Sequence, residues 1–232
     1  MITFKNLKKS YSKNIVLDID LLEIPKGQAF GLVGNNGAGK TTLFSCLLDL
    51  IKPTKGEVVN NEIEVRKSED WKKFSSAYLD ESFLIGYLMP EEYFYFIAEL
   101  RGVRKTELDN FLNQFEDLFN GEILGGKKYI RDLSKGNQKK VGIVAALIGS
   151  PSVVILDEPF ANLDPTTQIR LKKIIKKLSA EKEVTVLISS HDLQDVTEVS
   201  ERIVLLEKGK IVKDIKTSKK TLKELESYFN KE

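Results

Sequence analysis

The eight residues Gly34–Thr41, GNNGAGKT, constrain the fold of this 232-residue chain more than any other segment. They fit the pattern G-x-x-x-x-G-K-[ST], whose glycines let successive backbone N–H groups surround phosphate oxygens at the start of a helix. The pattern requires a strand before it and a helix after it. The apolar run Ala29–Val33 and the segment Thr42–Ile51 are typical of those elements. The sequence therefore predicts a phosphate loop between a buried strand and a buried helix.

Two side chains of this phosphate loop have specific expected contacts. Lys40 is expected to bridge the β- and γ-phosphates of a nucleoside triphosphate, and Thr41 to place its hydroxyl on Mg²⁺. The alternative is a glycine-rich surface turn that binds no ligand. The expected nucleotide-binding residues of the loop and of the residue after it are Gly34, Asn35, Asn36, Gly37, Ala38, Gly39, Lys40, Thr41 and Thr42.

Alternating strand and helix patterns predict the fold class. Val153–Leu156 and Val184–Ile188 are short, apolar and rich in β-branched residues, which is typical of strands covered on both faces. A helical pattern separates them, and this order indicates an α/β fold with a mostly parallel sheet. The first 33 residues have strand patterns. Near the end of the chain, Arg202–Glu207 and Lys210–Ile215 predict a hairpin, and Thr221–Phe229 predicts a short amphipathic helix.

The stretch from about residue 90 to residue 149 has a different pattern, with helical periodicity and no buried strand. It predicts an inserted helical lobe. We expect a single domain, 1–232, in which residues 1–89 and 150–232 form a core lobe and residues 90–149 form the helical lobe. The expected helices of the helical lobe are Glu91–Leu100, Thr106–Phe119 and Gly136–Ile148.

Charge and cysteine content restrict the classes of partner. The chain has 36 basic and 34 acidic residues, and this net charge of +2 gives no global attraction to nucleic acid or acidic lipid. Cys46 is the only cysteine, which excludes an internal disulfide framework and fits a reducing compartment. The longest apolar stretch, Val141–Ile148, is too short to span a membrane, and Met1–Lys5 shows no secretion signal. We expect a cytoplasmic chain.

Two carboxylates follow directly after the apolar run Val153–Leu156. Ligands of doubly wound sheets gather where such strands end, so Asp157 is expected to hold Mg²⁺ through water. Glu158 is expected to orient and deprotonate an attacking water. The alternative is that these acidic residues cap a following helix. Their combination with the phosphate loop favours hydrolysis.

His191, the only histidine, follows another buried strand pattern, at what is expected to be the same edge of the sheet. An imidazole there can contact the γ-phosphate and the attacking water, so the candidate catalytic residues are Glu158, His191 and Lys40. The alternative is a histidine at a helix start with no chemical role, where Ser190 or Asp192 caps the helix.

The segment Leu133–Gln138, LSKGNQ, resembles the signature sequence LSGGQ of the ATP-binding cassette (ABC) ATPases. We call it the signature segment. Other motifs similar to those of this family occur in the family's order, and the resemblance covers residues 2 to about 215. Those motifs are an aromatic residue at Tyr11, the phosphate loop, a region near Glu81, the signature segment, Asp157-Glu158, the D-loop segment Asn162-Leu163-Asp164, and His191.

The resemblance implies a P-loop NTPase core of mostly parallel sheet, with an antiparallel β subdomain and an inserted helical subdomain. It also implies that two cassettes clamp ATP and Mg²⁺ between them, with Ser134 and Gly136 of one cassette contacting the γ-phosphate bound to the other. Asp164 is then part of the nucleotide site. By the same resemblance Tyr11 stacks on adenine, and the alternative for Tyr11 is ordinary packing in a strand.

Two segments depart from the family pattern. Lys135 and Asn137 replace the usual Gly and Gln of the signature, whereas Ser134 and Gly136 remain. At the Q-loop the family places a glutamine that contacts Mg²⁺ and senses the transport partner, and here Glu81 occupies that position. A carboxylate can still approach Mg²⁺. The expected metal contacts are therefore Thr41, Asp157 and Glu81.

Six aromatic residues lie within the 14 positions from 83 to 96. In transport cassettes this region receives a short helix of the membrane subunit, so these residues form either an exposed docking patch or the core that joins the two lobes. Both interpretations remain open from the sequence. The six residues are Phe83, Tyr87, Tyr93, Phe94, Tyr95 and Phe96.

The resemblance implies an ATP-binding and ATP-hydrolysing subunit of an ABC transporter, exporter-like, which powers a separate membrane-spanning permease. Export is favoured over import. The expected partners are that permease and a second ABC ATPase, in a homodimer or a heterodimer, with no direct nucleic acid. The expected location is the cytoplasmic face of the cell membrane, through the permease. The first alternative is a soluble, non-transport ABC ATPase that acts on nucleic acid, ribosomes or assembly complexes. The second is a cassette that binds ATP without hydrolysing it.

Overall fold

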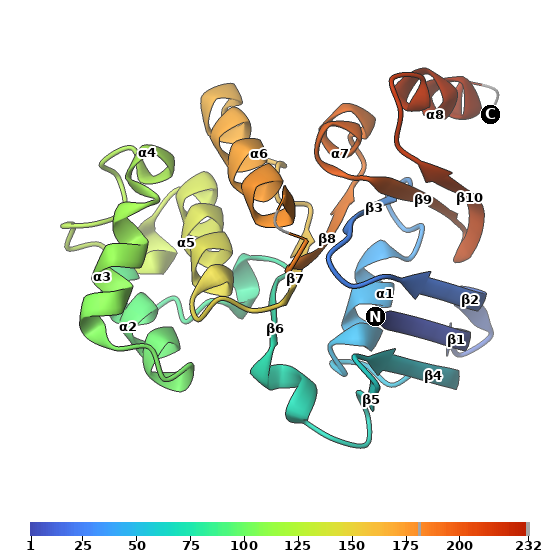
Figure 1. Cartoon of the computed structure of the whole chain (residues 1–232), viewed down its shortest axis with the longest axis horizontal. Helices are drawn as coiled ribbons and strands as arrows, with labels where there is room; N and C mark the ends of the chain where they lie inside the picture. The colour runs from blue at the N-terminus through green and yellow to red at the C-terminus, as the bar shows by residue number, and fades with distance from the viewer. Residues whose placement is uncertain (181, 231–232) are drawn as a thin grey trace.

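A mixed sheet forms the centre of the computed structural model, which describes residues 1–180 and 182–230 (Figure 1). Neighbouring strands pair in parallel except at β10, which is antiparallel to β9. The order confirms the predicted mostly parallel sheet. Across the sheet the strands are β10 (Lys210–Lys216), β9 (Arg202–Glu207), β3 (Ala29–Val33), β8 (Thr185–Ser190), β7 (Val153–Asp157) and β6 (Ser75–Tyr78).

A second sheet is antiparallel and includes the strands expected near the N-terminus. Strands β4 and β5, which continue this sheet after the first helix, were not expected from the sequence, and neither was β6 at the edge of the mixed sheet. In spatial order the antiparallel strands are β2 (Asn14–Ile24), β1 (Ile2–Tyr11), β4 (Lys55–Asn60) and β5 (Ile63–Glu64).

Helix α1 (Lys40–Leu47) lies between the two sheets, where its buried side chains join those of both in one core. Strand β7 buries side chains on both faces of the mixed sheet. Successive residues of a strand point to opposite faces, so Val153 and Ile155 join the core around α1, whereas Val154 and Leu156 face the opposite layer of helices. This double burial accounts for the continuous apolar runs in the sequence.

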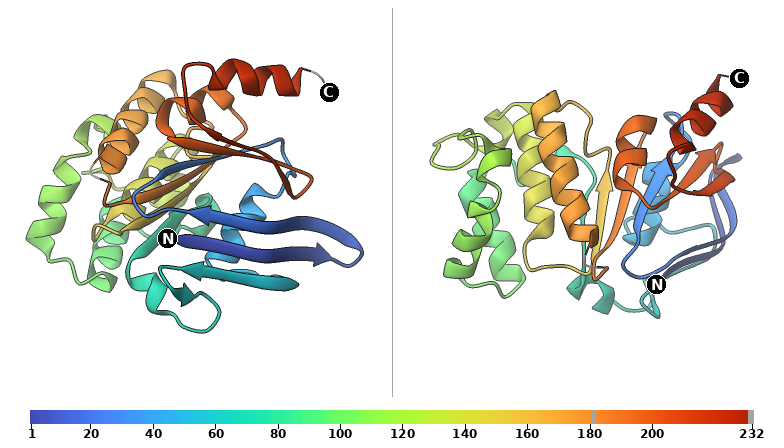
Figure 2. Two further views of the ribbon diagram at one scale, coloured as in Figure 1. Left: turned by 45° about the vertical axis from the view of Figure 1, so that its right-hand side comes forward. Right: turned by 45° about the horizontal axis from the view of Figure 1, so that its top comes forward.

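The remaining helices form two groups along the chain: α2 to α5 lie between β6 and β7, and α6 to α8 follow β7. In both views of Figure 2, helices α2 to α5 lie at the opposite end of the molecule from the antiparallel sheet. The boundaries of the core lobe and the helical lobe stay a prediction from the sequence. The helices are α2 (Pro90–Leu100), α3 (Lys105–Asn113), α4 (Glu116–Phe119), α5 (Lys135–Leu147), α6 (Pro165–Ala180), α7 (Leu193–Val199) and α8 (Thr221–Phe229), with 3-10 turns η1 (Asp70–Lys73), η2 (Glu81–Phe83) and η3 (Ile130–Asp132).

Two of the predicted helices differ from the structure by more than one residue at an end. Helix α1 begins two residues earlier than Thr42 and ends at Leu47 rather than Ile51, because Asp49 has a left-handed backbone (φ 50°) that a helix cannot continue. The single helix expected over residues 106–119 is two helices, α3 and α4, separated near Phe115. The break lets Phe115 pack its ring 4.9 Å from that of Phe111 in the core of the helical lobe.

Gly31 of β3 allows α7 to lie against the sheet, and its replacement tests this packing. A Cβ at Gly31 would come within 2.3 Å of Val196 Cγ1 and 2.7 Å of Ser200 Oγ. We expect Gly31→Ala to lower the free energy of unfolding by about 1–3 kcal/mol, through overpacking, in urea titrations. Gly126→Ala is the control, since a Cβ there meets nothing within 4 Å. Equal unfolding midpoints for the two variants would contradict this packing.

Candidate functional site

The phosphate loop takes a fixed shape from glycine and from its own lysine. Gly39 has φ 109°, a backbone conformation open to glycine, and a Cβ there would meet Val16 O at 2.9 Å. Lys40 is 6% exposed and its Nζ donates a hydrogen bond to Gly34 O at 2.7 Å. The ammonium group thus lies inside the loop, where the sequence analysis expected the terminal phosphates to bind.

A cavity of about 190 Å³ opens at this loop. Backbone N–H groups at the start of α1 and the Lys40 ammonium give it the positive character that a phosphate requires. Asn35 lies on the other side of the loop, where it lines a neighbouring cavity of about 530 Å³ next to Phe229 of α8. The residues that line the smaller cavity are Val16, Asn36, Gly37, Ala38, Gly39, Lys40, Thr41, Thr42 and Glu158.

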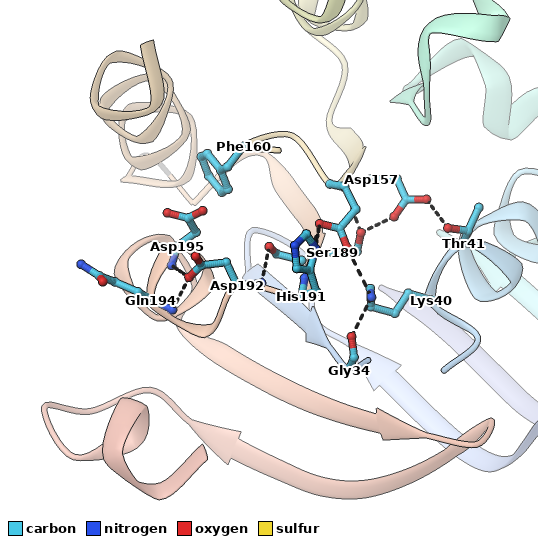
Figure 3. Close-up of polar contacts among 12 residues, drawn as sticks. Gly34, Lys40, Thr41, Asp157, Phe160, Ser189, His191, Asp192, Gln194 and Asp195 are labelled. Carbon is cyan, nitrogen blue, oxygen red and sulfur yellow. Dashed lines mark hydrogen bonds and ion pairs between the residues drawn. The ribbon is translucent and has the colours of Figure 1, made fainter. Parts of the chain in front are cut away.

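Asp157 is held at the end of β7 by two hydroxyl groups (Figure 3). Thr41 Oγ1 donates to its Oδ2 at 2.5 Å, and Ser189 Oγ donates to its Oδ1. Asp157 is 4% exposed, and this burial raises the pKa of its carboxyl, which the two hydroxyl hydrogen bonds oppose. Mg²⁺ prefers such hard oxygen donors, so the hydroxyl of Thr41 and the carboxylate of Asp157 fit the expected metal.

Glu158 joins the other two candidate catalytic residues. Its Oε1 lies 3.3 Å from Lys40 Nζ, and its Oε2 lies 2.9 Å from His191 Nδ1. The Glu158 backbone has φ 47°, a left-handed conformation that costs a non-glycine residue about 1–2 kcal/mol. Hydrogen bonds from Glu158 N to Ser189 O (3.2 Å) and Ser189 Oγ (3.0 Å) hold this conformation. The residue therefore turns its carboxylate toward the phosphate loop.

The helix-capping alternatives hold only in part. Asp192 caps α7 by accepting from Gln194 N (2.8 Å) and Asp195 N (3.2 Å), as the alternative for His191 proposed. His191 nevertheless contacts Glu158. Asp157 is bonded to side-chain hydroxyls, so it does not act as a helix cap.

The signature segment and the D-loop segment lie together, away from the phosphate cavity of the same chain. Ser134 caps α5 by accepting from Asn137 N at 3.2 Å. A Cβ at Gly136 would come 3.3 Å from Asn162 O, so the two segments are in close contact. Asp164 accepts from Thr167 N at 3.0 Å and caps α6. This separation fits the expectation that a second cassette supplies these groups to the nucleotide.

Two expected ligand contacts lie apart from the phosphate cavity. Tyr11, at the end of β1, is 52% exposed, and Lys9 Nζ lies 4.6 Å from its ring centre. Stacking of Tyr11 on adenine stays a prediction. Glu81 lies in η2, where its Oε1 accepts a hydrogen bond from Tyr78 OH at 2.7 Å. Its contact with Mg²⁺ also stays a prediction.

The six aromatic residues divide between the two interpretations. Tyr93 and Phe94 are buried in the core of the helical lobe, at 8% and 0% exposed. The other four are exposed: Phe83, Tyr87, Tyr95 and Phe96.

Comparison with known proteins decides the family. Residues 17–161 match the family model described as ABC transporter. The chain belongs to this family. The uncharacterized ABC transporter ATP-binding protein YhaQ of Bacillus subtilis (strain 168) is 35% identical, over 100% of this chain and 74% of YhaQ. The methionine import ATP-binding protein MetN of Francisella tularensis subsp. holarctica (strain OSU18) is 33% identical, over 94% of this chain and 64% of MetN.

A solved ABC cassette has the same fold. The dimeric structure of the ATP-binding cassette MJ0796, in a post-hydrolysis state bound to ADP and Pi, superimposes with a TM-score of 0.83 and 25% sequence identity. The match covers 94% of this chain and 99% of that one. The expected P-loop core with antiparallel and helical subdomains is thereby confirmed.

Within residues 1–180 and 182–230 of this ABC cassette, no helix has both the length and the apolar character needed to cross a membrane.

Ser189 and Val16 also belong to the cassette's site, although neither was expected from the sequence. Ser189 is fully buried and touches both Asp157 and Glu158, and a polar residue ending an apolar strand two positions before His191 was the available signal. Val16 lines the phosphate cavity from β2, because the antiparallel sheet lies against the phosphate loop. No motif marks Val16, since this contact joins two separate sheets.

Asp157→Asn tests the cost of the buried carboxylate. Because the folded protein raises the pKa of Asp157 above its ordinary value of 3.8, the folded state holds the proton more tightly than the unfolded state does. Ionisation of Asp157 therefore destabilises the fold as pH rises above about 3.8. We expect the variant without nucleotide to be more stable than the parental protein by about 1 kcal/mol at pH 7. The difference should shrink toward pH 4. Urea unfolding across this pH range measures the difference in the free energy of unfolding between variant and parent. A variant that gains less stability over the parent at pH 7 than at pH 4 would contradict the assignment.

Proposed function

We propose that this ABC cassette hydrolyses ATP and that hydrolysis drives a separate membrane permease. The observation that carries the proposal is the position of Glu158, whose two carboxylate oxygens lie against Lys40 and His191 at the mouth of the phosphate cavity. A carboxylate in that place can accept a proton from a water molecule that attacks the γ-phosphate. The family match and the MJ0796 structure bound to ADP and Pi support the same chemistry.

Each residue of the site has a proposed part in hydrolysis. Lys40 exchanges its ion pair with Glu158 for the β- and γ-phosphates, which frees the carboxylate to accept a proton. Glu158 orients the water and takes its proton, while His191 fixes the carboxylate through Oε2. Thr41 and Asp157 would hold Mg²⁺, which neutralises charge on the phosphates when bound.

We also propose that the complete site needs a second cassette. Ser134, Gly136 and Asp164 do not line the phosphate cavity of their own chain. Ser134 caps the N-terminal end of α5, and the positive end of a helix dipole suits a phosphate. The structure of MJ0796 is dimeric, which supports this arrangement. Either an identical chain or a related cassette fits the requirement.

A groove between the lobes supports the permease as partner. It has a volume of about 400 Å³, and its walls come from β6, η1, α2 and α5. Leu50, Phe83 and Leu100 line it and are 51%, 57% and 68% exposed. Exposed apolar side chains gathered around one groove indicate a binding surface, and an apolar helix of the permease is the occupant we propose.

The direction and location of transport follow as further predictions. Export stays the direction predicted from the sequence, although one matched relative is named for methionine import. Through the permease the cassette would lie at the cytoplasmic face of the membrane. The groove favours this function over a soluble ABC ATPase that acts on nucleic acid or ribosomes.

Glu158→Gln tests hydrolysis. The glutamine keeps the size of the side chain and removes the proton acceptor, so we expect ATP binding to persist while the turnover rate falls by about 10²- to 10⁴-fold. An ATP-bound dimer should accumulate and elute earlier in size-exclusion chromatography with Mg-ATP.

The control is Glu116→Gln, which makes the same chemical change at an exposed position in α4. It should hydrolyse ATP at the parental rate. A Glu158→Gln variant that also does so would refute the assignment of Glu158.

Phe83→Asp tests the groove. A charge placed among the apolar side chains should weaken the permease contact and leave the phosphate cavity intact. We expect at least about tenfold less permease to co-purify from solubilised membranes, with unchanged ATP hydrolysis by the isolated cassette. Leu21→Asp on β2 is the matched control, because Leu21 is 56% exposed and does not line the groove. Equal recovery with both variants would contradict docking at this groove.

A further inference from the structure

Lys139 is a buried cation that the mechanism above does not use. It lies on α5 in the helical lobe and is 5% exposed. Its Nζ donates a hydrogen bond of 2.8 Å to the backbone carbonyl of Glu158, across the boundary between the lobes. Burying an ammonium group is costly, so a lysine in this position is expected to have a specific contact that offsets the cost.

The carbonyl that Lys139 holds belongs to a residue with an unusual backbone. Glu158 is in the left-handed region, and Ser189 holds its N–H from β8. Lys139 holds the opposite end of the same residue from α5. With both backbone groups bonded, rotation of Glu158 is restricted, and its carboxylate keeps its direction toward Lys40 and His191.

A second contact connects Lys139 with the segment that carries Glu81. Tyr78, at the end of β6, has its ring centre 6.0 Å from Lys139 Nζ and donates from its hydroxyl to Glu81. The ring lies directly on α5, because a Cβ at Gly142 would come within 2.4 Å of it. Lys139 therefore stands between the Glu81 segment and the carbonyl of Glu158.

We propose that Lys139 is a positioning residue for hydrolysis, which aims the Glu158 carboxylate by holding its backbone carbonyl and so makes that aim depend on the placement of the helical lobe. The inference rests on the proposed function, since it requires Glu158 to be the proton acceptor. Because Ser134 of the signature segment caps the helix that carries Lys139, a movement of that segment reaches Glu158 through α5.

The test is a set of variants at position 139. Lys139→Met keeps an unbranched side chain of similar length and removes the hydrogen-bond donor to Glu158 O. We expect kcat to fall by about 10- to 100-fold because the Glu158 carboxylate is misplaced. KM and the affinity for ATP should stay within about twofold, since the phosphate contacts remain. Lys139→Gln carries an amide donor and should restore kcat to within about threefold of the parental value. Lys139→Leu is measured in the same way, so that a folding failure of the methionine variant does not remove the test.

A control and a double variant separate positioning from packing. Lys140→Met removes a neighbouring lysine that is also 5% exposed, and whose Nζ lies 3.4 Å from Glu122. It should lower stability without lowering kcat. In the Glu158→Gln background, Lys139→Met should cause no further loss of the residual rate, because Lys139 acts through Glu158.

Two results would overturn the inference while the proposed function stands: a folded Lys139→Met or Lys139→Leu variant with the parental kcat, or an equal fold-loss from Lys139→Met with and without Glu158. A Glu158→Gln variant that hydrolyses ATP at the parental rate would overturn the proposed function itself. The two failures are therefore distinguishable.

Discussion

The ion pair between Lys40 and Glu158 is the contact on which the site depends, because it joins the phosphate loop to the strand that carries the proposed catalytic carboxylate. Lys40 is the first residue of α1, after β3, and Glu158 follows β7, more than a hundred residues later in the chain. The parallel sheet brings both to the same edge, since the carboxyl ends of its strands lie side by side. His191, after β8, reaches that edge for the same reason.

The same edge carries a cost in stability. Burial raises the pKa of Asp157, and Glu158 has a left-handed backbone. Both features lower the free energy of unfolding. Hydroxyl groups of Thr41 and Ser189 and the ammonium of Lys139 hold these two residues in place. Function here is built on arrangements that the surrounding structure must enforce.

Much of this arrangement could be predicted from the sequence because the informative residues are close together in the chain. Short local patterns predict the phosphate loop, the strand that ends in Asp157, and the hairpin formed by β9 and β10. Strand β6 was missed because Ser75-Ser76-Ala77-Tyr78 has no apolar run, and it is a strand through its pairing with β7. Ser189 and Lys139 were missed because their roles arise from contacts with Glu158 that only the folded chain brings together.

The central claim is that Lys40 exchanges Glu158 for phosphate when ATP binds, and the most direct measurement is a structure of the chain with Mg²⁺ and a non-hydrolysable ATP analogue. The account predicts that Lys40 Nζ moves to hydrogen-bond distance, about 2.7–3.2 Å, from a phosphate oxygen. It predicts that the Glu158 carboxylate keeps its contact with His191. A triphosphate bound outside this cavity, with Lys40 still paired to Glu158, would contradict the account.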